Sequence, residues 1–275
     1  MDNQFTQRPD YNGFLSVNFR HTYDPQVHSG DVLETDLLIY VSQQTNQHQL
    51  DLVFTELSVG PRGQFLREYV ESASWRPHIV ASIVHLDNSH YYHAIGAGID
   101  IDKQFSQKTN GSVATSVAIK KYRADAGRTT ARLQNGTEAD LEFSVFHQAM
   151  ENLMFTTSAG VKNSDAVESL NGNTEFSFGL GASLTHDPLF KIKTGAWTTS
   201  FNAEVLYSRY HAPDPSVNSI KRRKDTEIRG TLLTSIPVTE ELSITTTLAR
   251  TVVDSNFLNY SYTNWSATFG VSKRF

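Results

Sequence analysis

The chain has 275 residues, no cysteine and a formal net charge of −5, from 24 basic and 29 acidic residues. The lack of cysteine excludes disulfide-stapled scaffolds and cysteine-based zinc sites, and no basic patch interleaved with aromatic residues suggests nucleic-acid binding. No run of 18 or more apolar residues is present, so a transmembrane helix is not predicted. No linker or repeat divides the chain, and we predict one domain over residues 1–275.

Apolar and polar residues alternate along many segments with the period of two that is typical of strands. Between 175 and 184, for example, Phe176, Phe178 and Leu180 alternate with Ser177 and Gly179. In chain order, the predicted strands are 11–22, 32–42, 50–59, 74–86, 94–101, 112–122, 139–145, 153–162, 175–184, 197–207, 226–237, 242–252 and 264–275.

Two all-β folds share this alternation, the soluble β-sandwich and the transmembrane β-barrel. Many predicted strands have about 10 or more residues, whereas strands of globular proteins have roughly 5–6. The polar faces are rich in Gly, Ser and Thr, aromatic residues such as Trp75, Tyr207 and Trp265 lie near strand ends, and the chain ends in Phe275. We therefore predict an all-β fold, a single closed antiparallel transmembrane β-barrel in a bacterial outer membrane.

Bacterial single-chain barrels have an even number of strands and both termini on the periplasmic side. We therefore expect about 12 to 14 strands, with 14 preferred, and look for the additional one near 60–74. The first strand should pair with the last, because an open edge leaves backbone groups unsatisfied in lipid. The longer polar connections near 123–137, 163–174, 211–224 and 255–261 are assigned to the outer side, and the shorter ones near 107–111, 148–152 and 238–241 to the periplasmic side, with Asn110-Gly111 as a hairpin turn.

The alternation also predicts which side chains face lipid, because a slip of one residue inverts a whole strand. Ser177, Gly179, Thr245 and Gly270 should face the lumen. The side chains expected to face lipid are Phe176, Phe178, Leu180, Leu242, Ile244, Leu248, Phe269 and Val271.

Charged residues on the polar faces should point into the lumen, because an Arg or Lys facing the middle of the bilayer costs about 2–4 kcal/mol. These residues either pair and fill the lumen or line a path for water. The run Lys221-Arg222-Arg223-Lys224 falls in a predicted outer loop, where it either contacts lipopolysaccharide phosphates or an acidic partner, or is simply solvated. The predicted lumen-facing charged residues are Arg76, Glu138, Asp140, Glu142, Arg229 and Arg274.

Neither the Gly-x-Ser-x-Gly motif nor the His-Glu-x-x-His motif of hydrolytic enzymes is present in the chain. His90 and His93 flank two tyrosines without an adjoining carboxylate cluster, and Ser82 and His85 alternate to opposite faces. We predict no catalytic residue, no metal site and no cofactor. A barrel enzyme that acts on lipids is the least favoured of three functional hypotheses, and the other two are a transport or secretion barrel and a structural anchor.

The last segment, 268–275, resembles the C-terminal sorting signal of outer-membrane barrels through Thr268, Gly270 and Phe275, although Lys273 stands where an apolar residue is usual. The last quarter is also similar to the barrel domain of the surface lipoprotein assembly modifier family. This resemblance rests on 210–214, 221–225, 254–256, 260–262 and 272–275. Members of that family carry a periplasmic tetratricopeptide domain before a barrel of about 14 strands and help to move lipoproteins to the cell surface. The present sequence contains no tetratricopeptide region.

Together these observations favour a transport or secretion barrel that works with a periplasmic partner. The alternative is a structural anchor or interaction subunit of a larger envelope complex without an open pore. The expected partners are outer-membrane lipid and lipopolysaccharide, the barrel assembly machinery, and a periplasmic or surface protein. The chain begins Met1-Asp2-Asn3 without an apolar signal region, so we expect the signal peptide to be absent from this sequence.

Overall fold

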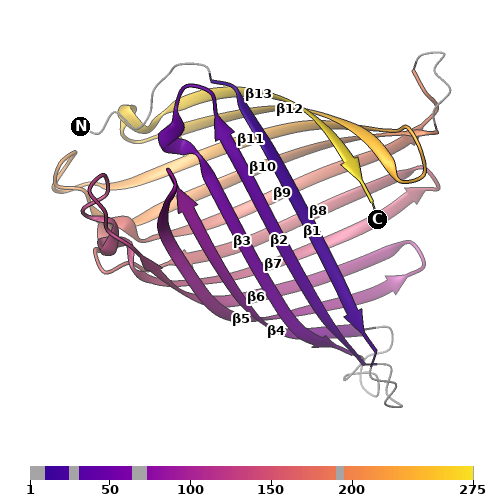
Figure 1. The fold of residues 1–275 in the computed structure, drawn as a ribbon, viewed down its shortest axis with the longest axis horizontal. Helices are drawn as coiled ribbons and strands as arrows, with labels where there is room; N and C mark the ends of the chain where they lie inside the picture. Colours follow the sequence, from indigo (N-terminus) through magenta and orange to yellow (C-terminus); the bar gives the residue numbers. More distant parts are fainter. Residues whose placement is uncertain (1–9, 25–30, 64–72, 190–194, 275) are drawn as a thin grey trace.

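The structure is a computed structural model that describes residues 10–24, 31–63, 73–189 and 195–274. These residues form one antiparallel sheet of 13 strands, each hydrogen-bonded to its neighbours along the chain. The sheet curls round on itself, so that β1 to β3 cross in front of the later strands in Figure 1. The strands are β1 (Asn12–Tyr23), β2 (Val32–Gln44), β3 (Leu52–Arg62), β4 (Ala73–Leu86), β5 (Ser89–Ser106), β6 (Thr109–Tyr122), β7 (Gly136–Met150), β8 (Leu153–Ser164), β9 (Asn173–His186), β10 (Trp197–Pro213), β11 (Arg222–Pro237), β12 (Leu242–Ser255) and β13 (Tyr262–Lys273).

Each of the 13 predicted segments corresponds to one strand, which confirms the all-β antiparallel class. The preferred count of 14 is wrong. Within the suspected region, residues 60–62 continue β3 and Gly63 bridges to Trp75, whereas 64–72 lie outside the described residues.

The turn between β4 and β5 is a two-residue hairpin that the sequence analysis did not identify. Asp87 and Asn88 both have positive φ, 53° and 56°, which is the backbone that a type I′ turn requires and that Asp and Asn tolerate. Asn110 and Gly111, predicted as a turn, are instead paired residues of β6. That prediction is wrong because β5 and β6 extend further than their apolar alternation indicated.

Helical structure in the described residues is limited to four short 3-10 turns, η1 (His48–Leu50), η2 (Ala131–Gln134), η3 (Ser169–Asn171) and η4 (Leu258–Tyr260). None of the helices in the described ranges is long and apolar enough to cross a membrane.

The connections alternate between the two ends of the sheet. One end, here called the long-loop end, carries 123–135, 165–172, 214–221 and 256–261, together with the two-residue turn 87–88. The opposite end, called the short-turn end, carries the short turns 107–108, 151–152 and 238–241, together with the longer connection between β9 and β10. The seven connections that the sequence analysis assigned to a side are grouped as predicted, whereas 87–88 and the β9–β10 connection do not follow the difference in length.

An odd number of strands places the start of β1 at the long-loop end and the end of β13 at the short-turn end (Figure 1). The expectation that both termini lie on one side is therefore wrong for this sheet. β1 and β13 run parallel to each other for the same reason.

The predicted closure of the first strand on the last is also not found. In the described residues β1 pairs with β2, β13 pairs with β12, and no pairing joins β1 to β13. Every residue of β1 is exposed on both faces, as expected for a free edge. Direct closure would need a parallel pair of strands, whereas an even count would have allowed an antiparallel one.

The outer face of the sheet carries large apolar side chains, and the inner face carries small and charged ones. Seven of the eight side chains predicted to face lipid are exposed, and the eighth, Leu242, is half-buried. No large side chain among the described residues is fully buried, and the buried apolar residues among them are Ala73, Val84, Ala94, Ala131, Trp197 and Val253. The described part of the chain therefore lacks the apolar core that a soluble protein of this size would have.

Candidate functional site

The most buried charge on the inner face is Arg76 of β4, near the short-turn end, whose side chain is 7% exposed. Its Nη2 donates to Asp36 Oδ2 at 2.8 Å, and its Nε lies 3.3 Å from Glu34 Oε2. Its Nη1 lies 3.4 Å from Asp100 Oδ2. Three carboxylates therefore surround the Arg76 guanidinium, and their negative charges offset the cost of burying its positive charge.

Two further arginines extend this network, here called the Arg76 cluster. Arg62 Nε donates to Glu34 at 2.8 Å and its Nη1 to Asp102 at 2.6 Å. Arg20 Nε donates to Asp36 at 2.6 Å from the exposed edge strand β1. The cluster spans β1 to β5, and its members are Arg20, Glu34, Asp36, Arg62, Arg76, Asp100 and Asp102.

The register of the strands explains why this cluster assembles. Arg20 lies directly opposite Asp36, and Arg76 directly opposite Asp100, so that unlike charges face each other across neighbouring strands. With four carboxylates and three guanidiniums, the cluster has a formal charge of −1. This part of the inner face therefore carries a dense and nearly neutral set of fixed charges.

The predicted acidic residues of β7 find partners other than the predicted cations. Glu138 Oε2 lies 2.8 Å from Lys120 Nζ and 3.2 Å from Lys162 Nζ, on the two flanking strands. Asp140 accepts a hydrogen bond from Ser116, and Glu142 one from Ser144. The sequence placed these carboxylates on one face of a strand, but it did not identify the two lysines.

Arg229 and Arg274 differ from each other in position. Arg229 of β11 contacts Glu204 at 3.2 Å and Glu227 at 2.5 Å, both on the inner face. Arg274 lies beyond the end of β13, where its Nη2 donates to the carbonyl oxygen of Glu240 at 3.4 Å. Arg274 therefore caps the turn between β11 and β12 and does not join an inner ion pair.

A cavity of about 460 Å³ opens at the long-loop end. Its wall includes Arg223, whose guanidinium lies 3.7 Å from the ring centroid of Tyr260 and 4.5 Å from that of Tyr210. Arg223 Nη2 also lies 2.6 Å from Asp225 Oδ2. Lys120 and Glu138 line the same cavity, so charged and aromatic groups meet at this mouth.

The basic run of 221–224 is only partly where the sequence placed it. Lys221 precedes β11, but Arg222, Arg223 and Lys224 belong to the strand, so the prediction of a loop is wrong for these three. Their alternation turns Arg223 inward to the tyrosines and leaves Arg222 and Lys224 exposed on the outer face. The run had no apolar alternation, which is why the strand could not be recognised there.

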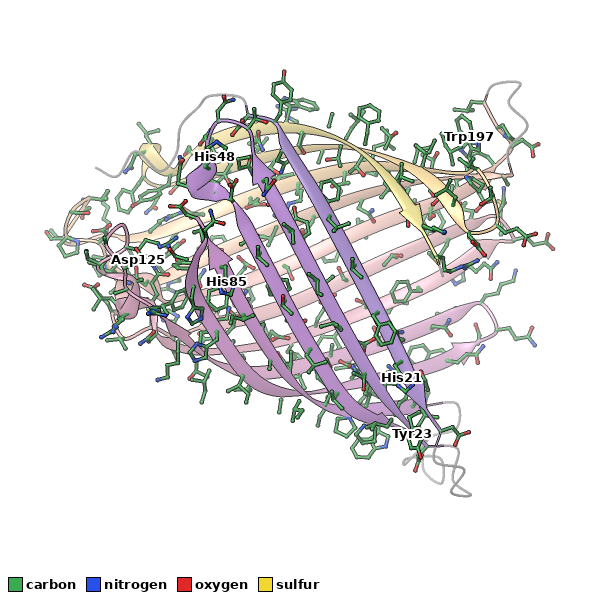
Figure 2. The ribbon with its side chains drawn as sticks, in the orientation of Figure 1. His21, Tyr23, His48, His85, Asp125 and Trp197 are labelled. Carbon is green, nitrogen blue, oxygen red and sulfur yellow. The ribbon has the colours of Figure 1, made fainter. Side chains whose placement is uncertain are left out.

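Arg128 links the connection 123–135 to the end of β4 and the start of β5 at the long-loop end. Its Nη2 donates to Asp125 at 2.5 Å and to the carbonyl oxygen of Leu86 at 3.2 Å, and its guanidinium lies 5.2 Å from the ring of Tyr91. Hydrogen bonding from Arg128 holds the pKa of the Asp125 carboxyl below its usual value. Figure 2 shows Asp125 and His85 at the long-loop end and Tyr23 at the other.

Two of the three predicted assembly residues lie in β13. Thr268 is opposite Thr247 and Gly270 is opposite Thr245. A Cβ on Gly270 would come within 2.9 Å of Thr245 Oγ1, so this position favours glycine. Phe275 lies outside the described residues.

Within the described part of the chain, no group of three or more His, Asp or Glu side chains is arranged to hold a metal ion. His90 and His93, considered as a metal pair from the sequence, lie side by side with ring centroids 5.4 Å apart. They are on the outer face with His85, away from the carboxylates of the Arg76 cluster.

Comparison with known proteins yields only distant similarity. No protein-family model and no curated protein sequence matches the chain. One solved structure, titled "Bacterial polysaccharide outer membrane secretin", aligns with 8% identity and a TM-score of 0.43 over 95% of this chain and 98% of that one. OccAB3 of Acinetobacter baumannii aligns with 9% identity and a TM-score of 0.47 over 92% of this chain and 66% of that one. At TM-scores below 0.5 these likenesses carry no argument, and the resemblance to the assembly modifier family gains no support from them.

Proposed function

We propose that this chain is an outer-membrane β-barrel that acts in transport or secretion, with the inner face of the sheet as the passage. The observation that carries the proposal is the inverted distribution of side chains, with large apolar groups exposed outside and charged groups inside. A lipid bilayer stabilises that arrangement, whereas water would leave the apolar face unsatisfied. A periplasmic partner would dock at the short-turn end, if that end faces the periplasm.

A second function is favoured by the packing of the Arg76 cluster. Because Arg76 is nearly buried among three carboxylates, this region is filled by ion pairs and opposes the passage of water. The barrel would then be an anchor or interaction subunit without an open pore.

Single-channel recording in planar bilayers separates the two functions. Transport predicts discrete conductance steps, and since the cluster carries one excess carboxylate, the steps should favour cations. Asp102→Asn would shift the reversal potential towards anions, because Asp102, at 48% exposure, is the most exposed of the four carboxylates of the cluster.

The matched control is Asp254→Asn, which removes the same charge from the outer face at the other end of the sheet. It should leave the reversal potential unchanged. Folded protein that inserts into the bilayer without conducting would overturn the transport proposal and support the anchor.

A further inference from the structure

Basic side chains lie directly opposite one another on the outer face at the long-loop end. Arg209 of β10 is in register with Lys224 of β11, and His93 of β5 is in register with Lys121 of β6. All four side chains are exposed. Arg209 and Lys224 carry like charges that repel each other across the strands, so an anionic counterion would stabilise them. In the second pair Lys121 is the charged residue, and an anion would stabilise it as well.

The described residues supply no such counterion. The inner-face cations Arg20, Arg62 and Arg76 each contact a carboxylate, but no ion pair involves Lys121, Arg209 or Lys224 within the described ranges. Acidic residues at this end of the sheet include Asp87 in the β4–β5 turn, Asp254 on β12, and Asp165, which lies 3.5 Å from His211. None of these three forms an ion pair with Lys121, Arg209 or Lys224 in the described structure.

Histidines enlarge the second of these two sites. His85 lies opposite His90, and the His90 ring stacks on His93 with centroids 5.4 Å apart and lies 5.6 Å from His85. The Nε2 of His90 is buried and has no hydrogen-bond partner among the described residues. The three histidine rings therefore form one cluster that adjoins Lys121 through His93.

Each basic pair is followed along its two strands by an apolar pair on the same face. Two residues along from His93 and Lys121, the exposed side chains of Ile95 and Ile119 lie in register. Four residues along from Arg209 and Lys224, Val205 and Ile228 do the same. A ligand that fits this arrangement has an anionic head and an apolar tail, and it lies with its head towards the long-loop end.

We infer that these two basic pairs, His93–Lys121 and Arg209–Lys224, bind the phosphate groups of membrane lipids whose acyl chains cover the adjacent apolar residues. Charge-assisted hydrogen bonds from lysine and arginine suit phosphate oxygens, and lipid phosphates lie at the height where an apolar belt ends. The inference rests on the proposed membrane position, and it assigns the long-loop end to a leaflet rich in phosphorylated lipid.

The test measures how many molecules of bisphosphorylated lipid A remain bound to the full chain in detergent, by native mass spectrometry over a lipid titration. The variant Lys121→Gln/Arg209→Gln/Lys224→Gln should weaken binding roughly fivefold at the His93–Lys121 site and roughly 25-fold at the Arg209–Lys224 site, since each surface cation contributes roughly fivefold. The control Lys103→Gln removes a cation from β5 near the short-turn end and should bind like the wild type. Dephosphorylated lipid A should bind the wild type as weakly as lipid A binds the triple variant.

The remaining arms separate other ligands and the membrane proposal itself. Millimolar inorganic phosphate should not displace lipid A, and complete displacement would make this a free-anion site and overturn the inference. Equal binding of phosphorylated and dephosphorylated lipid, or equal binding by the triple variant and the wild type, would overturn it as well. Flotation with neutral phosphatidylcholine vesicles tests membrane insertion alone, so that loss of insertion contradicts the proposed function and loss of phosphate dependence contradicts only this inference.

Discussion

Arg76 on β4 reaches Asp36 on β2 across the intervening strand β3, with 2.8 Å between Nη2 and Oδ2. Asp36 also accepts a hydrogen bond from Arg20 at 2.6 Å, so one carboxylate joins a buried and an exposed guanidinium. The two arginines therefore share Asp36 as a partner and differ in how deeply their side chains are buried.

Arg76→Gln should lower the free energy of unfolding by about 3–5 kcal/mol, because it removes the buried positive charge that Glu34, Asp36 and Asp100 share. Arg20→Gln should lower it by about 0–1 kcal/mol, because its side chain is largely exposed and solvent screens the pair. Urea unfolding of the detergent-folded protein, followed by tryptophan fluorescence, measures both. Equal losses would show that depth does not decide the strength of these pairs.

Phe201 and Asn202 are neighbours on β10 whose side chains lie on opposite faces, and both are exposed. Phe201→Arg should reduce stability in lipid vesicles by up to about 2–4 kcal/mol, since it places a cation against acyl chains. Asn202→Arg should change it little, because the inner face already holds charged groups. If both variants insert and unfold alike, the apolar face does not contact lipid.

Hydrogen exchange tests the unpaired edges. About half of the amides of β1 should exchange without protection, because an edge strand directs alternate N–H groups away from its only neighbour. The amides of β6 to β9 should be protected, since each of these strands is paired on both sides. Uniform protection of β1 and β13 in detergent, measured by mass spectrometry of peptic fragments, would show that the seam closes in solution.

Deleting Phe275 should lower the amount of folded protein in outer membranes while leaving refolding into detergent nearly intact. The reason is the resemblance of 268–275 to a sorting signal, which would act during assembly. Quantitative blotting of membrane fractions is compared with the refolding yield. A similar loss in both assays would make Phe275 a packing element, and no loss in either would remove the basis for the resemblance.

The alternation of side chains predicted the strands and the exposed face because both depend on local pattern alone. Ion-pair partners depend on register between strands, which is why the contacts of Arg76 with Glu34 and Asp36 were not predictable. At strand ends the pattern itself fails, since Arg222, Arg223 and Lys224 are all cationic whichever face they occupy. The preference for 14 strands came from a general rule about closed barrels, and it was wrong although the alternation had indicated each strand present.

The parallel run of β1 and β13 has a consequence for labelling the protein. In a bilayer crossed by 13 strands, an epitope placed just before Asn12 and one placed just after Lys273 would lie on opposite sides. An antibody added to intact cells would then reach only one of them, and permeabilisation would be needed for the other. Two tags on one chain would thus reveal, without any further structure, whether another strand completes the wall.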